Sequence, residues 1–122
     1  MTQEEKQLLL KDLSARLPHN VVIRCTDSDT DYNCFLTTDI LHEIQNDYEY
    51  YDYKPYLRPM SSMTASETME YTSVCVKYAG KPEIGGLVET LLEFYCSHHL
   101  DYRGLIEKGI ALEAPEGMYK TK

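Results

Sequence analysis

Three aspartates at alternate positions, Asp27, Asp29 and Asp31, are the first candidate for chemistry in the sequence. Calcium loops place oxygen ligands at alternate positions, with glycine at the sixth position and a bidentate glutamate at the twelfth. Here those two positions hold Tyr32 and Thr38. The pattern is more typical of a hairpin turn, in which short polar side chains bond the backbone. We therefore predict no metal site and no cofactor.

A second candidate is the pair His98-His99, which stands close to Cys96 and Asp101. These are zinc-ligand types, but adjacent histidines point in different directions and no second ligand pair has the usual spacing. We interpret the pair as the polar end of a helix, where imidazole suits the helix dipole.

Four cysteines, at positions 25, 34, 75 and 96, form no CxxC pair. The first residues contain neither a basic stretch nor a long apolar stretch, so we expect no signal peptide and a cytoplasmic protein with reduced thiols. We interpret the cysteines as small buried hydrophobic residues. Cys25 and Cys34 are expected to face each other across a hairpin, without a disulfide being required.

Two motifs of known enzyme classes are missing from the sequence. There is no GxSxG motif, and residues 77–82 lack the spacing of a phosphate-binding loop. We predict no catalytic residue, and an enzyme with an unrecognised site stays as the alternative. Arg58 and Arg103 are expected to bridge structural elements through carboxylates.

The charge distribution is the most informative feature of the sequence. The chain carries 20 acidic and 12 basic residues, a net charge of -8. Residues 25–53 contain eight acidic residues and no lysine or arginine, so this segment accounts for the whole net charge. Such a balance argues against binding to a phosphate backbone.

Tyrosines accumulate at the end of this acidic segment. Tyrosine gives a large contact area at low entropic cost, and acidic residues attract a basic partner. The segment therefore predicts a protein-binding surface, in one version a mimic of nucleic acid; the alternative is a solvated sheet face with tyrosines packed partly inward. The candidate binding residues are Asp27, Asp29, Asp31, Asp47, Tyr48, Glu49, Tyr50, Tyr51, Asp52, Tyr53 and Tyr56.

The elements that carry these residues are predicted from periodicity and turn signals. Thr2 and Glu5 have capping-box spacing and begin a helix over 2–17, which Pro18 ends. Strands are predicted over 21–25 and 32–38, with a third strand or a short helical turn over 40–45. Residues 47–54 alternate, with a bulge at Tyr50-Tyr51, and Pro55 closes this β-rich half.

Helices dominate the second half of the sequence. Thr64 and Glu67 form a second capping box at the start of a helix that extends to Tyr78. A helix over 86–98 has a wide apolar surface and is expected to be the most buried one. A short helix is predicted near 104–108, and residues 115–122 are expected to be frayed.

The order of these elements predicts one α+β domain over 1–122. It comprises an N-terminal helix (1–18), a β-rich acidic half (20–56) and a helical half (64–114) with two to three helices. The sheet is expected to be small and antiparallel, with an SH3-like meander as one arrangement. No stretch is long and apolar enough to span a membrane.

Four stretches together resemble a family of small uncharacterised proteins from gut Bacteroidetes genomes and their phages or prophages. They are residues 1–6 (MTQEEK), 13–18 (LSARLP), 54–64 (KPYLRPMSSMT) and 100–109 (LDYRGLIEKG). The resemblance implies a cytoplasmic protein of mobile-element origin and favours an interaction role. It assigns no catalytic or binding residue.

The sequence thus favours a non-enzymatic protein that binds another protein with a basic surface and modulates a host or phage enzyme. A nucleic-acid-associated accessory protein is a further alternative, which would need the basic residues outside 25–53 to gather on one face. Tyrosines on an edge strand would also allow a homodimer.

Overall fold

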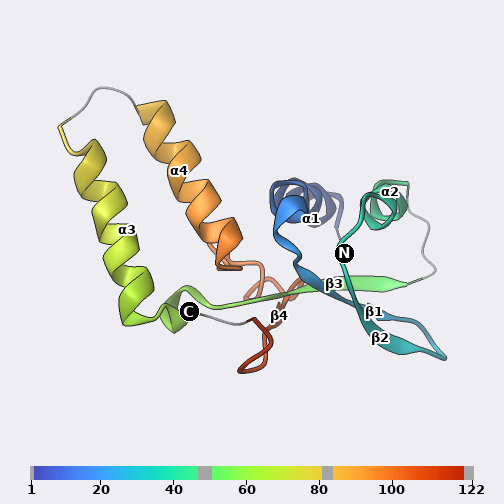
Figure 1. The fold of residues 1–122 in the computed structure, drawn as a ribbon. Helices are drawn as coiled ribbons and strands as arrows, with labels where there is room; N and C mark the ends of the chain where they lie inside the picture. Colours follow the sequence, from blue (N-terminus) through green and yellow to red (C-terminus); the bar gives the residue numbers. More distant parts are fainter. Residues whose placement is uncertain (1, 47–50, 81–83, 120–122) are drawn as a thin grey trace.

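Two helices cover one face of a small mixed sheet, and two further helices form an arm beside it (Figure 1). The computed structural model describes residues 2–46, 51–80 and 84–119. This arrangement confirms the α+β class and the N-terminal position of the first helix.

The first helix, α1, spans Gln3–Arg16 and begins as the capping box predicts. The N–H of Glu5 donates to Thr2 Oγ1 at 3.1 Å, and the N–H of Thr2 donates to Glu5 Oε1 at 2.8 Å. A short 3₁₀ turn, η1 (Leu17–His19), follows at Pro18 and turns the chain into the sheet.

The sheet contains β1 (Val22–Thr26), β2 (Asp31–Phe35), β3 (Asp52–Leu57) and β4 (Leu112–Glu113) in the order β2-β1-β3-β4. β1 pairs antiparallel with both β2 and β3, whereas β4 runs parallel to β3. Because β3 pairs with β1 and not with β2, the sheet is not a meander. No strand is predicted from the sequence at the position of β4.

Helix α2 (Thr38–Gln45) connects β2 to β3 and decides between the two predictions for residues 40–45. The Thr37 hydroxyl accepts the N–H of Ile40 at 3.3 Å and caps this helix. Ile40 and Ile44 lie one turn apart and are both buried, so α2 covers the sheet beside α1.

The core lies between these two helices and one face of the sheet. Alternate residues of β1 and β3, such as Ile23 and Leu57, point into it and meet Leu9 and Leu13 of α1. Pro55 does not close the β-rich half, as the sequence suggested. It is fully buried inside β3 opposite Ile23, and the strand continues to Leu57.

The arm consists of α3 (Ala65–Tyr78) and α4 (Ile84–Ser97), reached from β3 through the 3₁₀ turn η2 (Met60–Ser62). The capping box of Thr64 and Glu67 is confirmed. The expectation that α4 is the most buried helix is wrong. Among its described side chains only Phe94 and Cys96 are buried, because α4 projects away from the sheet with α3 (Figure 1).

The C-terminal segment is turn-rich and is held more firmly than expected. Residues 104–108 form turns and no helix; the Asp101 carboxylate accepts the N–H groups of Leu105 and Ile106 at 2.9 and 3.0 Å. The expected fraying does not extend to Tyr119, whose hydroxyl accepts the N–H of Val22 and donates to the carbonyl of Tyr56. Residues 120–122 lie outside the described part.

Candidate functional site

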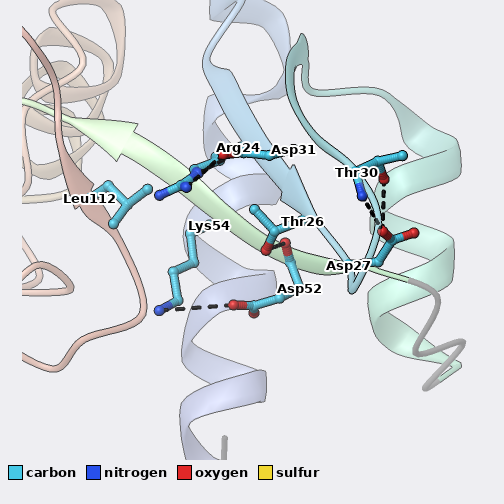
Figure 2. A pocket seen from close by; sticks show the side chains of 8 residues that line it. All are labelled: Arg24, Thr26, Asp27, Thr30, Asp31, Asp52, Lys54 and Leu112. Carbon is cyan, nitrogen blue, oxygen red and sulfur yellow. Dashed lines mark hydrogen bonds and ion pairs between the residues drawn. The ribbon is translucent and has the colours of Figure 1, made fainter.

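The face of the sheet opposite α1 and α2 carries a hollow of about 370 Å³ (Figure 2). The lining side chains come from all four strands and from the β1–β2 turn. They are Arg24, Thr26, Asp27, Thr30, Asp31, Asp52, Lys54 and Leu112. Three of the predicted binding residues, Asp27, Asp31 and Asp52, thus gather in one place.

In this hollow, two basic residues lie beside carboxylates of the acidic segment. Arg24 and Lys54 stand directly outside the segment in sequence, and strand pairing places them opposite each other. Arg24 donates to both carboxylate oxygens of Asp31 at 2.9 and 2.8 Å, while Lys54 lies 3.9 Å from Asp52 (Figure 2). The hydrogen bond from Arg24 lowers the pKa of Asp31. The centre of the face therefore has mixed charge, which the sequence did not reveal.

Asp27 organises the β1–β2 turn. One of its carboxylate oxygens accepts the N–H groups of Asp29 and Thr30, at 2.8 and 2.6 Å, and the Thr30 hydroxyl at 2.9 Å. These bonds, that from the Asp29 N–H first, lower the pKa of Asp27. The predicted hairpin turn is confirmed, and Asp29 is exposed at its tip. Within the described ranges no group of three or more His, Cys, Asp and Glu side chains could hold a metal ion.

Two of the described tyrosines at the end of the segment, Tyr51 and Tyr53, pack inward. Tyr53 is buried, and its hydroxyl donates to Glu43 of α2. Tyr51 is half-buried and packs edge-on against Tyr32, with ring centroids 5.7 Å apart. Tyr56 is half-buried on the open face of the sheet, which is the face opposite α1 and α2. The remaining predicted residues, Asp47, Tyr48, Glu49 and Tyr50, lie outside the described residues.

Two aromatic side chains that are exposed lie on β2. Tyr32 is 45% exposed and Phe35 is 61% exposed, and neither was among the predicted binding residues. β2 is one of the two outer strands of the sheet, so one of its two edges has no partner strand in the described chain. The sequence does contain an aromatic strand beside the acidic turn. It does not give the order of the strands, and only that order shows that this strand lies at an edge of the sheet.

Hydrogen bonds at the ends of the β1–β2 pair establish which backbone groups face β1. The N–H of Leu36 donates to the carbonyl of Val21, and the N–H of Asp27 donates to that of Thr30, both at 2.9 Å. In an antiparallel pair such bonded positions recur at every second residue. The even-numbered residues of β2 therefore direct their N–H and C=O groups towards β1.

The odd-numbered residues of β2 consequently direct their backbone groups to the free edge. These residues are Asp31, Asn33 and Phe35, and all three are exposed. An extended peptide that aligns with β2 would find donors and acceptors at the spacing of a strand ladder. The acidic turn at Asp27–Asp31 lies at one end of this edge.

The histidines lie at the base of the arm. His98 Nδ1 is 2.9 Å from Glu67 and its Nε2 is 3.1 Å from Glu70, so both ring nitrogens face carboxylates. His99 stacks on Tyr119 with ring centroids 3.7 Å apart, and burial, followed by the charge of Arg16, lowers its pKa to about 4. This arrangement fits an anchor between helices better than a general base.

Every arginine of the sequence lies beside a carboxylate. Arg16 and Arg103 approach Asp12, whose side chain is fully buried, at 2.7 and 3.2 Å. Arg58 pairs with Glu67 at 2.7 Å, which confirms the structural role expected for Arg58 and Arg103. The fourth, Arg24, pairs with Asp31. Because each of the four arginines already lies beside a carboxylate, none of them is free to bind a phosphate group.

Comparison with protein-family models, curated proteins and solved structures finds no match to this chain. Among the described helices, none has the length and apolar character needed to cross a membrane.

Proposed function

We propose that the chain is a non-enzymatic protein-interaction module that binds a basic, extended segment of another protein along the free edge of β2. The free edge itself, with outward backbone groups at Asp31, Asn33 and Phe35, is the observation that carries this proposal. Tyr32 and Phe35 supply apolar contacts on the two faces of the strand.

Charge supports a basic partner over other ligands. The segment 25–53 has eight acidic residues, and Asp29 is exposed beside the edge. Arg24 and Lys54 interrupt the carboxylates on the open face, which favours a peptide ligand over mimicry of a regular phosphate row. The pairing of each arginine with a carboxylate disfavours direct binding of nucleic acid.

The cellular setting that we propose follows from the resemblance noted in the sequence. A phage- or prophage-encoded protein in the cytoplasm of a Bacteroidetes host would meet host or phage enzymes with basic surfaces. Binding to such an enzyme would modulate its activity.

The test is a pull-down from a gut Bacteroidetes lysate, treated with nuclease, in which Asn33→Pro is compared with Asn33→Ala. Proline removes the outward N–H of residue 33 and leaves the β1–β2 bonds in place, because those use the even-numbered residues. Alanine keeps the N–H. We expect wild type and Asn33→Ala to capture the same basic partner, and Asn33→Pro to retain about a tenth of it or less.

Thermal melts of the three proteins verify that each is folded before the capture is compared. Equal capture by Asn33→Pro and wild type would contradict binding at this edge. Recovery of the bait alone would contradict the interaction role in that host. Partner capture should also fall as salt is raised, since opposite charges attract the partner.

A further inference from the structure

Among the residues that the structure describes, most of the apolar surface of the arm has no partner. The hydrophobic core beneath α1 and α2 includes no residue of α3 or α4. The arm residues that are buried, Glu67, Phe94 and Cys96, all lie in the turns next to the sheet. The two helices contact each other along their length, at the base through Tyr71 and Phe94 and further out through Tyr78 and Thr90.

Large apolar side chains on the arm are therefore open to solvent in a single chain. Met69 is 70% exposed, Val76 is 67% exposed and Val88 is 48% exposed. Both helices have apolar residues on more than one face, so packing α3 against α4 covers only part of them. The half-buried remainder comprises Val74, Cys75, Tyr78, Leu87, Leu91 and Leu92. A pair of helices normally buries such a surface against another layer.

The accessible surface of the chain is correspondingly large. The chain exposes 7793 Å², whereas a compact monomer of 14.1 kDa exposes about 6,700 Å². The chain therefore exposes about 1,100 Å² more than a compact monomer of its mass.

Charges at the two ends of the arm would complement those of a reversed copy. The acidic groups at the base lie near histidines of their own chain, Glu70 at 3.1 Å from His98 and Glu93 at 3.3 Å from His19. Glu70 and Glu93 are exposed near the base, with side chains 55% and 70% accessible, while Lys77 is exposed in the last turn of α3. When two arms pack in opposite directions, Lys77 of each chain lies over the acidic base of the other. A two-fold interface makes this contact twice.

The lengths of the helices also suit this arrangement. α3 and α4 have 14 residues each, so two arms supply four helices of about 21 Å each. Four helices of equal length joined by short connections form a bundle in which every helix has an inner face.

We propose that the α3–α4 arms of two chains pack in opposite directions as a four-helix bundle, so that the protein is a two-fold symmetric homodimer. This interface lies on the arm and not on β2, so it is independent of the proposed binding function.

The test is the mass of the full chain in solution, measured by light scattering after size exclusion over a hundredfold range of concentration. Wild type is expected at twice 14.1 kDa. Val88→Glu and Lys77→Glu are each expected to raise the dimer dissociation constant at least tenfold. Tyr32→Glu, on the edge of the sheet, is the matched control and should leave the dimer intact.

Several results would overturn the proposal. A wild-type protein that stays monomeric at all concentrations would overturn it, and the partner of the arm would then have to be a different protein. Loss of the dimer in Tyr32→Glu alone would assign dimerisation to the edge of β2. If Val88→Glu does not fold by circular dichroism, Val88→Ser gives the same comparison with a milder change, and an unchanged dissociation constant there would contradict the bundle.

Discussion

The guanidinium of Arg58 and the carboxylate of Glu67 form a two-point ion pair, with both nitrogen–oxygen distances at 2.7 Å. The same guanidinium donates to the carbonyls of Ser62 and His98 at 3.0 and 3.1 Å. Glu67 in turn completes the capping box with the N–H of Thr64 at 2.8 Å. One arginine after β3 therefore links the first turn of α3 to the residue that directly follows α4.

Replacing Arg58 by alanine should lower the free energy of unfolding by about 3 kcal/mol or more, because it leaves the buried Glu67 carboxylate without its charged partner. Arg24→Ala is the control: its ion pair with Asp31 is largely exposed and should contribute less than about 1 kcal/mol. Urea unfolding of both variants measures the two changes. Equal losses would show that the arm does not depend on this ion pair.

The same ion pair makes stability depend on pH in the acidic range. The hydrogen bond from Arg58, followed by that from the Thr64 N–H, lowers the pKa of Glu67 from 4.5 to about 2. Because the pKa is lower in the folded state, the stabilisation is fully present above pH 4.5 and is lost as the pH falls towards 2. The difference in unfolding free energy between wild type and Glu67→Gln should therefore shrink over this interval.

Unfolding curves at several pH values between 2 and 7 measure this difference. Glu107→Gln, at an exposed position, is the control and should differ little from wild type at any pH. A difference for Glu67→Gln that stays constant down to pH 2 would show that the carboxylate is not stabilised by Arg58.

Local signals in the sequence predicted the elements better than their arrangement. Both capping boxes, at Thr2 and Thr64, mark the start of a helix because the interaction involves only four consecutive residues. The apolar surface of α4 was read as burial in the core, although periodicity does not say what covers a face. Its position on a projecting arm depends on long-range contacts such as that of Arg58 with His98.

In the candidate site, too, local features could be predicted from the sequence and long-range ones could not. The turn at Asp27 follows from local chemistry, and the structure confirms it. The neutralisation of Asp31 by Arg24 depends on strand register, and the exposure of Phe35 depends on which strand is outermost. Neither property can be calculated from composition or spacing alone.

The four cysteines should differ in their reactivity with iodoacetamide. Cys25 and Cys96 are buried, and burial raises the pKa of both thiols, so the reactive thiolate is scarce at neutral pH. Cys34 and Cys75 are half-buried. Mass spectrometry at pH 8 should find Cys25 and Cys96 alkylated at least about tenfold more slowly than the other two.

Labelling in urea is the control, and there all four cysteines should react at similar rates because unfolding removes the burial. Fast labelling of Cys25 in the folded protein would contradict its position in the core. The Cys25 and Cys34 sulfur atoms lie 3.3 Å apart, as the hairpin interpretation expected, and both are free thiols.

The hydroxyl of Tyr119 should contribute measurably to stability, although it lies in a segment that the sequence suggested was frayed. It accepts the N–H of Val22 at 2.8 Å and donates to the carbonyl of Tyr56 at 2.7 Å. Tyr119→Phe keeps the ring stacked on His99 but leaves both backbone groups unsatisfied, which should cost about 1–3 kcal/mol.

Tyr102→Phe is the matched control, because the buried Tyr102 hydroxyl has no hydrogen-bond partner in the described part of the chain, and its removal should be nearly neutral. Urea unfolding of the two variants separates these outcomes, and a neutral Tyr119→Phe would mean that the C-terminal segment does not hold β1 and β3 together.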